Sequence, residues 1–162
     1  MAGEVVAVPA LESLPFAVAL REHGLAYALV KGAHLFGVAM LVGPVLAFDL
    51  RVLGYGKSIP VTWLARHLLP LSVAALVFIV PTGLALFAAN ATALQNAWAF
   101  TLKMIVISMG AVLAIAFHNG PYRGVADWDT DVTAPFTARV ITTLSVVGWL
   151  ITIGLATQLA HA

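Results

Sequence analysis

The stretch "AWAFTLKMIVISMGAVLAIAFH", residues 97–118, decides the fold class of this chain. Its single residue that is charged at neutral pH is Lys103, and its remaining residues are mostly apolar. A helix of this length rises about 33 Å, and the hydrocarbon core of a bilayer is about 30 Å thick. We therefore expect a transmembrane helix over residues 97–117.

Three further apolar runs of similar length, at about 25–48, 68–89 and 136–159, accompany the first. The whole chain is 62% hydrophobic and 9% charged, whereas soluble domains carry about a quarter charged residues. The connections between the runs are short, so consecutive helices are expected to be antiparallel neighbours. The sequence predicts an all-α integral membrane protein, an up-down four-helix bundle over residues 25–162.

Residues 1–24 have a different pattern. Glu4 and Glu12 interrupt the stretch where the apolar core of a cleavable signal peptide would lie, and no basic region precedes it. Apolar residues recur between Pro9 and Glu22, which is typical of a short helix lying on the membrane surface. A frayed terminus is the alternative up to Pro9.

The distribution of basic residues predicts the orientation in the membrane. One side of the predicted bundle carries five basic residues, and the loops of the other side carry Arg21 alone. The positive-inside rule places the first group in the cytoplasm. We expect a multi-pass protein of the bacterial inner membrane with both termini on the outer side. The five residues are Arg51, Lys57, Arg66, Arg123 and Arg139.

Composition also excludes several classes of partner and site. The net charge of +1 comes without a basic stripe, so no nucleic-acid partner is expected. The absence of cysteine excludes disulfides and thiolate metal sites. Histidines divide between the two membrane faces, which leaves too few for a zinc site, and no catalytic constellation of Ser, His and Asp can be assembled. The partner that composition does predict is the lipid bilayer.

Two histidines are the main candidate for chemistry. His67 begins the second predicted span and His118 ends the third, so antiparallel packing would bring both imidazoles to one depth. Two axial imidazoles are a common way to hold haem iron, and haem b is therefore the candidate cofactor. His34 is the alternative partner of His118 if the spans are shifted. Three arginines on the same side are candidates to bind haem propionates: Arg66, Arg123 and Arg139.

A structural interpretation of these histidines stays open. His118-Asn119-Gly120 also reads as a helix C-terminus, where a cationic imidazole opposes the helix dipole. His67 follows Arg66 at a water-facing boundary, where it can simply be solvated.

Ionisable residues inside the spans form a second candidate site. Lys31 and His34 share one helical face, and Lys103 lies at a comparable depth on the third span. These residues predict an outer-side pocket for a lipid headgroup or a quinone, although lysine stems can also extend to the headgroups. Trp149 belongs to a polar and aromatic face of the fourth span that either packs on a neighbouring helix or lines the same cleft.

Acidic residues near the cytoplasmic side are expected to have structural roles. Asp49 and Arg51 are two residues apart and do not share a helix face, so each is expected to form an ion pair with another group. The run Asp127, Asp129 and Asp131 is expected to be a solvated loop surface, or else a docking patch.

Three stretches carry a resemblance to a known family: "KGAHLFGVAMLVGPVLAFDLRVLG", "LARHLLPL…TGLALFAANA" and "NAWAFTLKMIVISMGAVLAIAFH". Together they resemble a family of small four-span bacterial membrane proteins of unassigned function, from about Leu25 to His118. The family pattern falls here on His34, Asp49 to Arg51, Thr82-Gly83, Lys103 and His118. His67 is less securely part of it. The architecture is also loosely similar to the CopD membrane domain and to cytochrome b-type bundles.

Three classes of function follow from these patterns. The leading one is a b-type-cytochrome-like membrane protein in electron transfer, or one associated with quinone. The competing class is a non-enzymatic accessory or anchoring subunit of a larger membrane complex or of a homo-oligomer. The third is transport of a small solute or metal, which would require oligomerisation because four short helices cannot enclose a path alone.

Overall fold

The computed structural model of the protein describes residues 4–160. Within that range every element is helical and there is no strand, which confirms the all-α prediction. The elements are α1 (Glu4–Glu12), α2 (Pro15–Glu22), α3 (Gly24–Val52), α4 (Val61–Ala89), α5 (Ala91–Asn96), α6 (Trp98–Asn119), the 3-10 helix η1 (Pro121–Asp127) and α7 (Phe136–Ala160).

Helices α3, α4, α6 and α7 are long and apolar enough to cross a membrane. They have 29, 29, 22 and 25 residues, against the roughly 20 that a bilayer core requires. Helix α4 begins at Val61, before the apolar run at 68, and Pro60 at its N-cap position has an extended conformation. These four helices indicate a multi-pass integral membrane protein.

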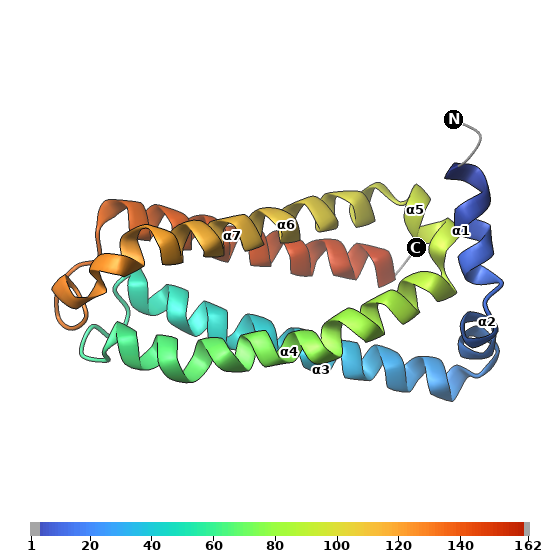
Figure 1. Ribbon diagram of the computed structural model, residues 1–162, viewed down its shortest axis with the longest axis horizontal. Coiled ribbons are helices and arrows are strands. Elements are labelled where there is room, and N and C mark those ends of the chain that lie inside the picture. Colours follow the sequence, from blue (N-terminus) through green and yellow to red (C-terminus); the bar gives the residue numbers. More distant parts are fainter. Residues whose placement is uncertain (1–3, 161–162) are drawn as a thin grey trace.

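The long helices form two hairpins that lie one above the other in Figure 1. Helix α3 packs along α4, α6 packs along α7, and the two hairpins join along α3 and α7. Helices α4 and α6 are consecutive spans, yet in the described part of the chain they do not pack along their lengths. They meet where Phe87 stacks on Phe100, with ring centroids 5.4 Å apart. The expectation that all consecutive spans are neighbours is therefore wrong for this pair.

One end of the bundle, which we call the lid end, is crossed by α1 and α2 beside α5 (Figure 1). Arg21 ties this lid to the bundle, donating to the carbonyls of Ala89 at 3.1 Å and of Glu12 at 2.8 Å. The Glu12 carboxylate accepts from the backbone N–H of Thr92 at 2.7 Å. The N-terminal segment thus forms two short helices, α1 and α2, whereas the sequence predicted a single one. The chain ends themselves lie outside the described residues.

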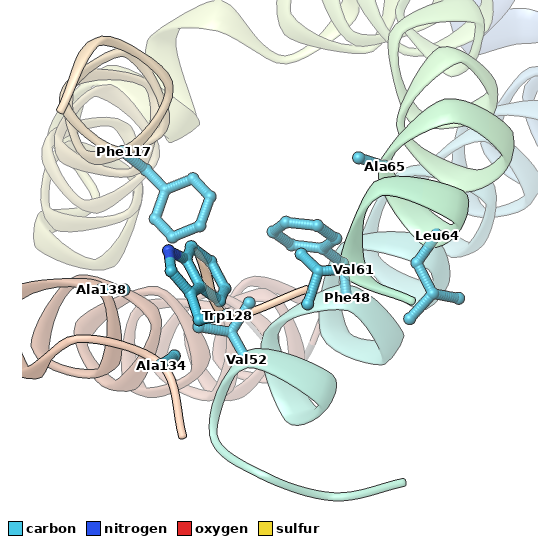
Figure 2. Close-up of a cluster of buried hydrophobic side chains, with 9 residues drawn as sticks. All are labelled: Phe48, Val52, Val61, Leu64, Ala65, Phe117, Trp128, Ala134 and Ala138. Atoms are coloured by element: carbon cyan, nitrogen blue, oxygen red, sulfur yellow. The ribbon is translucent and has the colours of Figure 1, made fainter. Parts of the chain in front are cut away.

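The opposite end, which we call the loop end, holds the main hydrophobic core (Figure 2). All four long helices contribute to it, and Trp128, from the segment that joins η1 to α7, lies among their side chains. Phe48 and Phe117 meet edge to face with centroids 5.6 Å apart. The core therefore fixes the ends of α4 and α6 relative to each other. It consists of Phe48, Val52, Val61, Leu64, Ala65, Phe117, Trp128, Ala134 and Ala138.

Two polar side chains fasten the loops over this core. Arg51 is only 2% exposed and donates to the backbone carbonyls of Ile59, Lys57 and Asp129. The Asp129 carboxylate accepts from the N–H of Thr62 at 2.8 Å and from its hydroxyl at 3.0 Å. Because Pro60 offers no side-chain cap, Asp129 caps α4 from a distant loop. The expected solvated role is thus wrong for Asp129.

Candidate functional site

A cleft of about 680 Å³ opens between α4 and α6 next to the core of the loop end. We call it the α4–α6 cleft. Because these two helices are not packed along their lengths, one stripe of α4 remains uncovered and forms most of the wall. The lining residues are Thr62, Ala65, Arg66, Leu69, Pro70, Val73, Ala74, His118 and Tyr122.

His118 stands at the end of α6 on the edge of this cleft, with its side chain exposed. Its Nδ1 lies 2.9 Å from the carbonyl oxygen of Ala114. A carbonyl only accepts, so Nδ1 carries the proton and Nε2 of the neutral ring has a free lone pair. The Tyr122 ring lies beside the imidazole, with centroids 5.2 Å apart. His118 therefore offers one acceptor nitrogen to a ligand.

The rest of the cleft is apolar apart from a few polar groups on α4. Arg66 supplies a guanidinium from an exposed position. Pro70, four residues later, has no N–H to return to the Arg66 carbonyl, which leaves a backbone acceptor without its helical partner. Leu69, Val73 and Ala74 provide an apolar wall. The cleft thus suits a ligand with a largely apolar body and an acidic or metal-bearing part.

His67, the predicted partner of His118, is not among the residues that line this cleft. Its ring stacks on Trp63 at a centroid distance of 4.4 Å, and its Nδ1 donates to the Trp63 carbonyl at 2.8 Å. The side chain is exposed on a neighbouring face of α4. The cleft therefore contains one of the two predicted axial imidazoles.

The three arginines that were predicted to bind propionates lie in three different places. Arg66 lines the α4–α6 cleft with His118. Arg123 is exposed and donates to the Asn119 side chain at 3.4 Å. Arg139 lines a different groove, of about 350 Å³, beside Leu53. Of the three, only Arg66 shares a site with His118.

His34 belongs to a separate polar cluster in the half of the bundle nearer the lid end. Its Nδ1 lies 3.0 Å from the hydroxyl oxygen of Thr82 on α4. A Cβ placed on Gly83 would lie 3.1 Å from Cε1 of His34, so the imidazole packs directly on the α4 backbone. Lys103 on α6 is half-buried, and it follows by three residues Phe100, the ring of which stacks on Phe87 of α4.

The other two residues of the predicted outer pocket lie differently. Lys31 is exposed on α3, and no side-chain hydrogen bond joins it to His34 within residues 4–160. Trp149 is half-buried on α7. On the same face of α7, Thr142 is buried and donates to the carbonyls of Ala138 and Arg139.

Sequence reasoning misjudged Asp49. The carboxyl is 4% exposed, its Oδ2 has no hydrogen-bond partner, and Ser145 of α7 lies beside it. Arg51 donates to backbone carbonyls instead. Among the described side chains, neither Asp49 nor Arg51 therefore forms the ion pair with another group that the sequence predicted. Within residues 4–160 no three His, Asp or Glu side chains gather in a way that would hold a metal ion.

Comparison of the chain with protein-family models, with curated proteins and with solved structures finds no match.

Proposed function

We propose that this protein is a b-type haem protein of the membrane that takes part in electron transfer, with its haem in the α4–α6 cleft and His118 as an axial ligand. The observation that carries the proposal is the free Nε2 of His118 at the edge of the cleft. Histidines that bind metals usually donate their other ring N–H to a carbonyl or carboxylate, as His118 does to Ala114.

The other residues of the cleft support the same ligand. Its volume of about 680 Å³ lies within the range of roughly 300–1,000 Å³ that is typical of small-molecule sites. The apolar wall of α4 suits a flat macrocycle, and Arg66 is placed to bind a propionate. A bound haem would supply a one-electron carrier at the loop end of the bundle.

A quinone fits this cleft less well than a haem. The carbonyl oxygens of an oxidised quinone only accept hydrogen bonds, whereas Nε2 of neutral His118 is itself an acceptor. A metal ion, in contrast, needs a lone pair at that position. The chemistry of His118 therefore favours haem.

The test is the absorption spectrum of the purified full chain, oxidised and then reduced with dithionite, with haem quantified as the pyridine haemochrome. We expect a Soret band that shifts on reduction. His118→Ala should abolish the band, and Arg66→Gln should weaken haem retention because a propionate loses its partner. His67→Ala is the matched control, since it removes an exposed imidazole outside the cleft. Monodisperse gel filtration of each variant reports on folding.

Each result has a defined meaning. A His67→Ala protein without the band would show that haem binding recruits both histidines, as the sequence predicts. A wild-type protein that is colourless and free of iron after expression with added haem precursor would overturn the proposal and favour the accessory-subunit class.

A further inference from the structure

The polar cluster of His34, Thr82 and Lys103 is independent of the haem proposal, because it lies in the half of the bundle nearer the lid end. Its members come from α3, α4 and α6. Lys103 follows Trp98, at the start of α6, by five residues, which places its Cα about 8 Å further along the helix. Trp98 is 70% exposed, as expected for an indole at the headgroup level. The Lys103 ammonium is therefore within reach of lipid phosphates.

The local approach of α4 and α6 places Lys103 on the level of His34 and Thr82. Phe87 of α4 stacks on Phe100 of α6. One helical turn further from the lid end lie Gly83 on α4 and Lys103 on α6. Gly83 is the residue on which the His34 imidazole packs. The stacked rings thus bring this part of α6 to the level of the His34 imidazole, with Lys103 on the side of α6 that faces α4.

The hydrogen bonds fix what His34 can offer to a ligand. The Thr82 hydroxyl has one proton and contacts the backbone carbonyls of Phe78 and Ile79, which can only accept. The hydroxyl therefore donates to Phe78 and accepts from Nδ1–H of His34. This leaves Nε2 as a hydrogen-bond acceptor. The site combines a cationic donor, Lys103, with a neutral acceptor, His34.

The cluster has no acidic partner of its own. Among the described side chains, His34 is bonded to Thr82, and no carboxylate is hydrogen-bonded to Lys103 or His34. An unpaired ammonium inside a membrane is expensive and usually marks a ligand site. A ligand that satisfies both residues has an anionic oxygen for Lys103 and a hydroxyl that donates to His34.

We propose that His34, Thr82 and Lys103 form a binding site for an anionic phospholipid with a hydroxylated headgroup, such as phosphatidylglycerol. Lys103 binds the phosphate, His34 accepts from the headgroup hydroxyl, and Thr82 holds the imidazole in the required tautomer. The acyl chains then run along the side of α6 that carries Lys103 and Ile107, four residues later.

The test is native mass spectrometry of the full chain in detergent, titrated with three lipids of equal chain length. We expect affinity to fall from phosphatidylglycerol to phosphatidylethanol, which keeps the charge but lacks the hydroxyl, and again to zwitterionic phosphatidylcholine. Lys103→Met should weaken phosphatidylglycerol binding about tenfold or more, the effect of losing one charge-assisted hydrogen bond. Lys103→Arg should retain binding.

Two further variants make the test specific. His34→Leu should abolish the preference for phosphatidylglycerol over phosphatidylethanol while keeping the preference for anionic lipid. Lys31→Met is the matched control, because Lys31 is an exposed lysine three residues from His34 on α3. An equal loss in Lys31→Met would show general electrostatic attraction and overturn the site. Displacement of the lipid by an equal concentration of inorganic phosphate would instead assign it to a soluble anion.

Discussion

Arg51 shows how one side chain can organise the loop end. Its guanidinium is buried and donates to three carbonyls, two in the α3–α4 connection and one, that of Asp129, in the connection before α7. A planar guanidinium spreads its donors over a fixed fork and reaches all three carbonyls at once, whereas an ammonium has its donors on a single nitrogen. The two loops of the loop end are thereby held to one residue of α3.

We expect Arg51→Met to destabilise the protein by about 3 kcal/mol, because each buried carbonyl left without a donor costs roughly 1–3 kcal/mol and partial relaxation offsets some of the sum. Arg51→Lys should recover only part of this loss. The measurement is reversible unfolding in mixed micelles. Lys57→Met is the control, since Lys57 is exposed and makes a single side-chain bond, to Thr133. A change below about 0.5 kcal/mol in Arg51→Met would contradict this role.

At the residue scale, the sequence selected two residues that the structure brings to one cleft and a third that lies outside it. His118 and Arg66 were selected as site residues and line one cleft. His67 follows Arg66 directly, so a rotation of about 100° about the helix axis separates the two side chains. The depth of His67 was readable from the sequence. The direction in which the His67 side chain points from α4 depends on how the hairpins pack. No local sequence pattern predicts this packing.

At the scale of elements, the α3–α4 hairpin depends on close approach at a glycine. A Cβ on Gly37 would lie 2.8 Å from Cγ1 of Ile79 and 3.1 Å from Cβ of Phe78. Small residues let membrane helices approach to such distances. This contact lies one turn from His34, so it also sets how closely the imidazole meets Thr82.

We predict that Gly37→Ala destabilises the protein by about 1–3 kcal/mol, the usual effect of overpacking. Gly43→Ala is the matched control on the same helix, since no neighbouring atom lies within 4 Å of its added Cβ. That variant should be neutral, or more stable by about 0.5–1 kcal/mol, because alanine favours helix. Thermal unfolding in detergent compares the two. Equal effects of both substitutions would show that the close contact has no energetic importance.

The number of long helices was predictable, because apolar runs report directly on spans, whereas α4 extends beyond its apolar run and begins at Val61. Which glycines form close contacts was not, since Gly37 and Gly43 look alike in the sequence and differ only in what faces them. The same holds for the lid. Its bond from Arg21 to Ala89 joins residues far apart in the chain, and neither has a distinctive local pattern.

At the scale of the whole molecule, the long helices alternate in direction, so the connections between them gather at two opposite ends. These two ends carry different numbers of basic residues. The lid end carries α1, α2 and α5, and the connections at 53–60 and 120–135 lie at the loop end. Basic residues concentrate at the loop end, where Lys57 and Arg123 are exposed, whereas Arg21 at the lid end is engaged in holding the lid. The positive-inside rule then predicts that the loop end faces the cytoplasm. The haem proposed beside His118 would exchange electrons on that side.

The absence of cysteine makes this orientation testable with single substitutions. Ser13→Cys places a thiol at an exposed position of the lid, and Ser58→Cys places one at an exposed position of the loop end. In intact bacterial cells whose outer membrane, where present, has been made permeable, a membrane-impermeant maleimide should label Ser13→Cys. It should label Ser58→Cys only after the cytoplasmic membrane is opened, because the charged reagent cannot cross the hydrocarbon core. The reverse pattern would invert the topology, and the α4–α6 cleft would then face an external electron donor or acceptor.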